Sequence, residues 1–152
     1  MNRKAQGYAR EILRNVKDLP EGTEAAISFA IDGSLKHVFT GTGPDMSVAI
    51  RGMQHPYVLL HNHASNDILS PEDILALIRH DNMVAIGAVG NKGALFTCEK
   101  VFGYSREKAV SFYQSILGQY PEMHVNLEQR VQFMQSFMKG AEKYGLHFSS
   151  PG

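Results

Sequence analysis

The sequence predicts a single α/β domain, with a mixed central sheet flanked by helices. Short apolar runs of strand length alternate with longer stretches in which apolar residues recur every three or four positions. The chain has 152 residues, which is within the size range of one domain. Its hydrophobic share of 43% and charged share of 20% are typical of a folded globular protein. We therefore expect one domain over residues 1–152, with its core at about 20–100.

Charge and cysteine content exclude several classes of protein. The 15 basic residues balance 15 acidic ones, so a strong electrostatic attraction for nucleic acid is not expected. Cys98 is the only cysteine, which excludes an intramolecular disulfide and suits a reducing, cytoplasmic location. Its apolar setting indicates a packed structural thiol rather than a nucleophile. Residues 1–17 lack the apolar centre of a signal peptide, and no stretch has the length of a membrane span.

Residues 2–17 predict the first helix. Ile12, Leu13 and Val16 lie on one side, and basic residues surround this short apolar stripe. A basic amphipathic helix can bind a membrane or a partner. Because the stripe is short, we favour a helix that lies on the domain with its basic face in solvent.

Residues 25–31 and 35–40 predict a β-hairpin. The first run is apolar, and Asp32-Gly33-Ser34 between the two runs is a typical hairpin turn. Glu24 stands where the first strand begins. A carboxylate there is either an ordinary surface residue or, if a reactive centre lies nearby, a candidate general base.

The stretch from Tyr57 to Asp73 carries the clearest chemical pattern. Residues 57–60 are an apolar run of strand length, and two histidines, His61 and His63, follow it. Side chains two residues apart on a strand point to the same face. Ser70 then resembles a helix N-cap, and Asp73, three residues later, completes a capping-box pattern at the start of a helix that runs to about residue 80.

This pattern predicts a metal site formed by His61, His63 and Asp73. Two imidazoles and one carboxylate that converge on one point leave the fourth position of a tetrahedral zinc ion open, which is typical of a catalytic site. Each part also has a simpler interpretation. The histidines can be a polar rim, and Ser70 with Asp73 can be a helix cap and nothing more. The conjunction of both parts favours the metal site.

The rest of the chain predicts two further strands and two helices. Apolar runs at 83–89 and 94–99 flank a Gly-rich tight turn, and helical periodicity covers about 105–118 and 126–144. The tail from Ser149 to Gly152 is expected to be loose.

The second of these helices has a broad apolar face that includes Phe133, Phe137 and Tyr144. Such a face can form a homodimer or bind a partner. Packing inside the domain is the commoner use, and we favour it here.

The spacing His61-x-His63 followed by Ser70-x-x-Asp73 resembles the motif of the JAMM (MPN-type) zinc metallopeptidases. The resemblance is tight over the motif and loose from about residue 24 to 99. Many members have proline where this chain has Ala64, and most have seven residues between the second histidine and the serine, whereas six stand here. The shorter loop is similar to a bacterial and phage-associated branch of the family.

The resemblance implies a cytidine-deaminase-like fold with Zn²⁺ bound by the two histidines and Asp73. It implies that Ser70 stabilises the tetrahedral intermediate and that a glutamate on an earlier strand activates the water. Glu24 is the candidate for that base, with Glu21 as the reserve.

The expected activity is zinc-dependent hydrolysis of peptide or isopeptide bonds in a protein or peptide substrate, with ubiquitin-like proteins as one substrate class. Two alternatives remain open. One is a catalytically inactive binding or scaffold module that keeps the fold. The other is a DNA-associated protein similar to RadC, against which the balanced charge counts.

Overall fold

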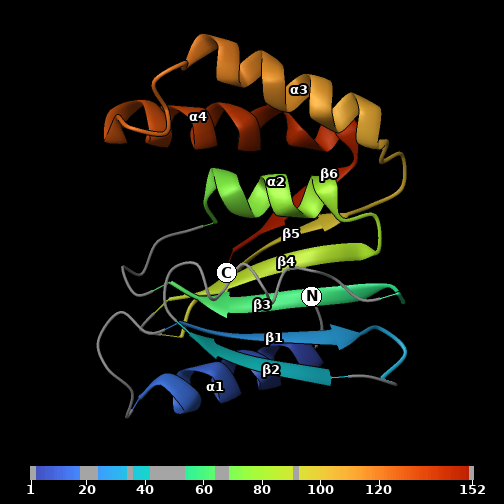
Figure 1. Ribbon diagram of the computed structural model, residues 1–152. Helices are drawn as coiled ribbons and strands as arrows, with labels where there is room; N and C mark the ends of the chain where they lie inside the picture. Colours follow the sequence, from blue (N-terminus) through green and yellow to red (C-terminus); the bar gives the residue numbers. More distant parts are fainter. Residues whose placement is uncertain are drawn as a thin grey trace.

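The computed structural model describes residues 3–17, 24–33, 36–41, 54–63, 69–90 and 93–150 (Figure 1). The strands are β1 (Glu24–Ala30), β2 (Lys36–Gly41), β3 (Tyr57–Asn62), β4 (Met83–Val89), β5 (Leu95–Lys100) and β6 (Leu146–Ser149). The helices are α1 (Arg3–Val16), α2 (Pro71–Arg79), α3 (Arg106–Gln119), α4 (Leu127–Gly140) and the 3-10 helix η2 (Ala141–Tyr144). The predicted α/β class with a mixed sheet is confirmed.

The six strands form one sheet in the order β2-β1-β3-β4-β5-β6. All neighbouring pairs are antiparallel except β3 and β4, which run parallel because α2 forms the crossover between them. The pairing aligns Ala26, His61, Ala88 and Phe96 in one row across β1, β3, β4 and β5. Directly paired residues have side chains on the same face, so this row, called the His61 row below, lies on one face of the sheet.

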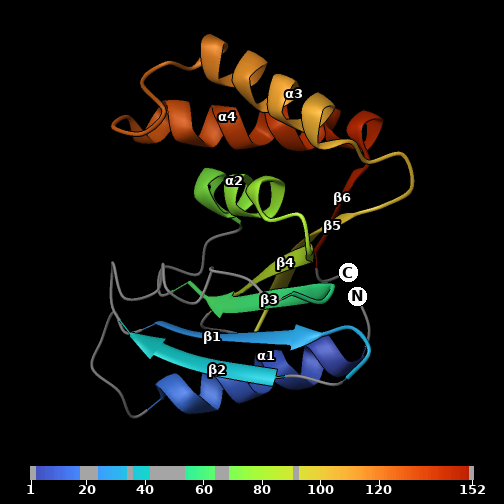
Figure 2. The same ribbon diagram turned by 45° about the vertical axis from the view of Figure 1, so that its right-hand side comes forward.

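Helices cover both faces of the sheet. Helix α1 packs on one face through Ala5, Ala9 and Ile12, which are buried against side chains of β1, β3 and β4. Helix α2 packs on the other face, and α3 and α4 lie beyond it (Figures 1 and 2). Across the described ranges, none of the helices combines the length and the apolar character that crossing a bilayer requires.

The C-terminal helices α3 and α4 contribute to the hydrophobic core on the α2 side of the sheet. Phe133 and Phe137 are fully buried and stack with ring centroids 6.0 Å apart, and Tyr113 of α3 meets Phe133 edge-on at 5.0 Å. The apolar face of α4 is therefore used for packing within the domain, at least at these two residues.

The end of the chain differs from the sequence prediction. The helix expected over 126–144 ends at Gly140, continues as η2, and stops at Gly145, whose φ of 76° is left-handed. The chain then returns as β6, and Ser149 pairs with Thr97 of β5. The expectation of a loose tail was wrong for Ser149, because the otherwise unpaired edge of β5 supplies backbone partners that local sequence does not reveal.

Candidate metal centre

The two histidines lie at the carboxyl end of β3. His61 is buried within the strand, and His63 follows its last residue. The N–H of His63 donates to the carbonyl of Val89 at 3.0 Å, which extends the pairing with β4 beyond the end of β3. Both imidazoles therefore stay on the face of the sheet that α2 covers, as their spacing predicts.

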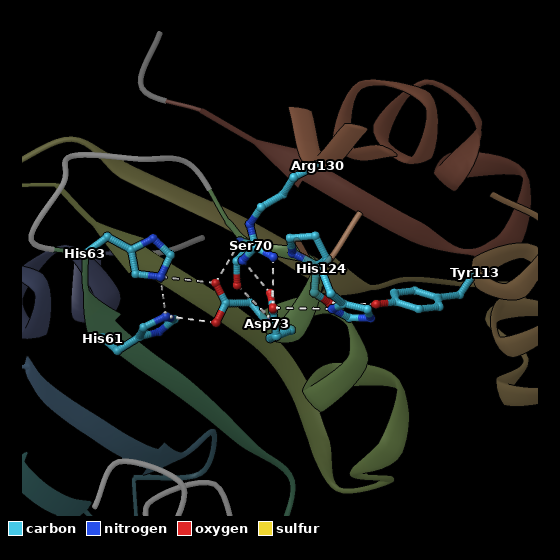
Figure 3. Close-up of polar contacts among 9 residues, drawn as sticks. His61, His63, Ser70, Asp73, Tyr113, His124 and Arg130 are labelled. Atoms are coloured by element: carbon cyan, nitrogen blue, oxygen red, sulfur yellow. Dashed lines mark hydrogen bonds and ion pairs between the residues drawn. The ribbon is translucent and has the colours of Figure 1, made fainter. Parts of the chain in front are cut away.

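The capping box at the start of α2 positions Asp73. The Oγ atom of Ser70 accepts a hydrogen bond from the N–H of Asp73 at 3.2 Å, and the N–H of Ser70 donates to Asp73 Oδ2 at 2.9 Å. Pro71 occupies the first helical position. The predicted helix cap is thus confirmed, and it fixes the carboxylate so that it points toward β3 (Figure 3).

The candidate ligand atoms of His61, His63 and Asp73 converge. The two Nε2 atoms are 2.9 Å apart, and they lie 3.0 Å (His61) and 3.2 Å (His63) from the two carboxylate oxygens of Asp73. Ligands at about 2.0–2.2 Å from a tetrahedral zinc ion are about 3.3–3.6 Å from one another. A slight opening of the cluster would therefore accommodate the ion, and the donor set fits zinc.

Asp73 is ionised in this setting. Burial alone would raise the pKa of its carboxyl, but the charges and hydrogen bonds of His61 and His63 outweigh burial and hold this pKa far below its ordinary value.

The second ring nitrogen of His61, Nδ1, is buried and has no hydrogen-bond partner among the described residues. Nδ1 is the atom that carries the proton when Nε2 binds a metal.

The C-terminal helices hold the first turn of α2 in place. Arg130 of α4 makes a bidentate ion pair with Glu72, at 2.9 and 2.6 Å (Figure 3). The hydroxyl of Tyr113 in α3 is 3.4 Å from the carbonyl of Pro71. Sequence reasoning missed these anchors, because Glu72 and Arg130 are 58 residues apart and each alone is an ordinary surface charge.

Glu24 begins β1, next to the same end of β3. Ala26 pairs with His61, and Glu24, two residues earlier, lies on the same face of the sheet. Within the described part of the chain, the cluster of candidate ligands does not take in Glu24. The reserve candidate, Glu21, lies outside the described residues.

Asn62 lies between the two histidines and is buried. Its Oδ1 accepts a hydrogen bond from the N–H of Ala25 at 2.6 Å. This contact joins the ends of β1 and β3 and so fixes the backbone that carries Glu24 relative to the backbone that carries the histidines. Because side chains alternate along a strand, Asn62 points to the face opposite that of the two histidines.

Cys98 is fully buried in the core on the α2 side of the sheet. Burial raises the pKa of its thiol well above the ordinary value. The prediction of a packed structural thiol is confirmed, and a thiol nucleophile is excluded at this position.

Comparison with known protein families, curated proteins and solved structures finds no match for this chain. The residues of the candidate site, the distances between them and the motif that they form are therefore what indicates a function.

Proposed function

We propose that this chain is a zinc-dependent hydrolase of peptide or isopeptide bonds. The convergence of His61 Nε2, His63 Nε2 and the Asp73 carboxylate, whose candidate ligand atoms all lie within 4.8 Å of one another, carries the proposal. Imidazole and carboxylate are ligands that zinc accepts, and three protein ligands leave one position for a reacting molecule. The resemblance of the motif to JAMM metallopeptidases supports the same reaction class.

Glu24 and Ser70 then have roles in the reaction. A bound zinc ion would supply a water of lowered pKa and would polarise the scissile carbonyl. The carboxylate of Glu24 would accept a proton from the attacking water and pass it to the leaving amine. Ser70 Oγ already accepts from the N–H of Asp73, so its own O–H is available to donate to the negative charge that develops on the substrate oxygen.

The variant Glu24→Gln tests this assignment. Glu24 is not in the ligand cluster, so zinc content and melting temperature should stay close to those of the parent protein. Hydrolysis of a panel of ubiquitin-like fusions and isopeptides should fall by roughly 10²–10⁴, the size of general acid–base assistance. Glu99→Gln on β5, away from the His61 row, is the matched control and should cleave as the parent does.

Two results would count against the proposal. If Glu24→Gln cleaves as fast as the parent, Glu24 is not the base and Glu21→Gln becomes the next variant. If the zinc-loaded parent cleaves no member of the panel yet binds one of them, the scaffold function replaces the hydrolase.

A further inference from the structure

A cavity of about 310 Å³ lies on the α2 side of the sheet and is lined by residues of β5, β6, α4 and the segment that precedes α2. Its walls include Leu69, Phe96, Met138 and Phe148, and Ser150, which is exposed, also lines it. The lining residues that the structure describes include no charged side chain. A cavity near the lower limit of known ligand pockets, about 300 Å³, suits one large apolar side chain.

The sheet register places this cavity relative to the cluster. Phe96 belongs to the His61 row, and Ala88 is the residue between them. Two strand spacings separate the backbones of His61 and Phe96, about 10 Å. Leu69 lines the cavity and directly precedes Ser70, so one short segment borders both the cavity and the first turn of α2.

We infer that this cavity receives an apolar side chain of the substrate, two or three residues from the scissile bond. An extended chain advances about 3.3–3.6 Å per residue, so three residues span the distance between His61 and Phe96. The cavity would thus select substrates with leucine, methionine or phenylalanine at that position over those with a charged residue. The inference rests on the proposed function, since it takes the scissile bond to lie at the cluster.

Peptide hydroxamates test the inference through binding rather than turnover. A hydroxamate binds zinc, so it anchors each probe at the cluster. One series extends from that group toward the amino end and one toward the carboxyl end, with leucine, phenylalanine, lysine or aspartate at the second or third residue. Calorimetry on the zinc-loaded protein gives each affinity, and acetohydroxamate alone reports the metal site.

The inference predicts that in one series the leucine or phenylalanine probe binds roughly 10- to 100-fold more tightly than its aspartate counterpart. Met138→Ala should widen the cavity and shift the preference toward phenylalanine. Phe96→Leu, on β5, should have the same effect. Val131→Ala, on the exposed side of α4, is the matched control and should leave the preference unchanged.

The outcomes separate this inference from the proposed function. If acetohydroxamate binds but neither series distinguishes apolar from charged probes, the cavity is not a substrate pocket, whereas the metal site stands. If the preference exists but neither Met138→Ala nor Phe96→Leu changes it, another surface makes the selection and the inference fails. If Met138→Ala and Phe96→Leu change the preference for apolar probes but no peptide is cleaved, the cavity binds side chains and only the hydrolase proposal fails.

Discussion

The ion pair between Glu72 and Arg130 fastens the helix turn that bears Asp73 to the C-terminal helices. Burial of Glu72 alone would raise the pKa of its carboxyl, but hydrogen bonds and charge from Arg130 outweigh burial and keep this pKa below its ordinary value of 4.5. We predict that Arg130→Met loosens this turn and has a small, bounded effect on both stability and zinc affinity.

Exposure sets the size of the effect. The Arg130 side chain is 31% exposed and that of Glu72 is 54% exposed, so solvent screens the pair. Bidentate geometry places it near the upper end of the range for surface pairs, about 0.5–1 kcal/mol. In a domain of this length, that corresponds to a decrease of about 1–4 °C in melting temperature. The same free energy limits the loss of zinc affinity to about fivefold.

A double-mutant cycle with Glu72→Gln and Arg130→Met measures the coupling through urea unfolding at pH 7. The lowered pKa of Glu72 gives the sign of the pH dependence. The stabilisation by the ion pair should be complete above pH 4.5, the ordinary pKa of a glutamate. It should disappear as the pH falls through the lower pKa that Glu72 has in the folded protein. A coupling of zero at pH 7 would show that the pair does not stabilise the fold and would refute this prediction. A loss of zinc affinity above 100-fold in a folded variant would show that Arg130 acts on the ligands directly.

Two further predictions concern packing. Gly87→Ala should lower the free energy of unfolding by about 1–3 kcal/mol, because its new Cβ would lie 2.5 Å from Leu60 Cδ2. Gly118→Ala, in open space on α3, is the control and should raise it by about 0.5 kcal/mol. Equal effects of the two variants in denaturant unfolding would contradict the packing described for β4. The Cys98 thiol should resist iodoacetamide at pH 8 in the folded protein and should react after unfolding, and mass spectrometry can follow the alkylation. Rapid labelling of the folded protein would show that the core opens at this residue.

Local patterns predicted the elements that surround the candidate site. The turn Asp32-Gly33, the capping pair Ser70 and Asp73, and the apolar run before His61 each act over a few residues, so the sequence alone shows them. The convergence of the three candidate ligands followed from one strand end and one helix start.

Long-range contacts could not be predicted in the same way. Strand β6 exists because Gly145 reverses the chain and the edge of β5 accepts a partner. A strand of only four residues that ends in a serine carries little signal in the sequence. The ion pair between Arg130 and Glu72 and the hydrogen bond from the N–H of Ala25 to Asn62 Oδ1 join segments that are distant in sequence. Such contacts depend on the tertiary arrangement, which no periodicity encodes.

The zinc content of the purified protein tests the central claim most directly. After removal of metal and reloading with zinc, atomic emission should find about one zinc per chain in the parent protein and in His37→Ala, an exposed histidine on β2 that serves as the control. His63→Ala and Asp73→Asn should each lose most of it while remaining folded. A parent protein that binds no zinc, or the same stoichiometry in both ligand variants, would contradict the claim that these three residues form a metal site.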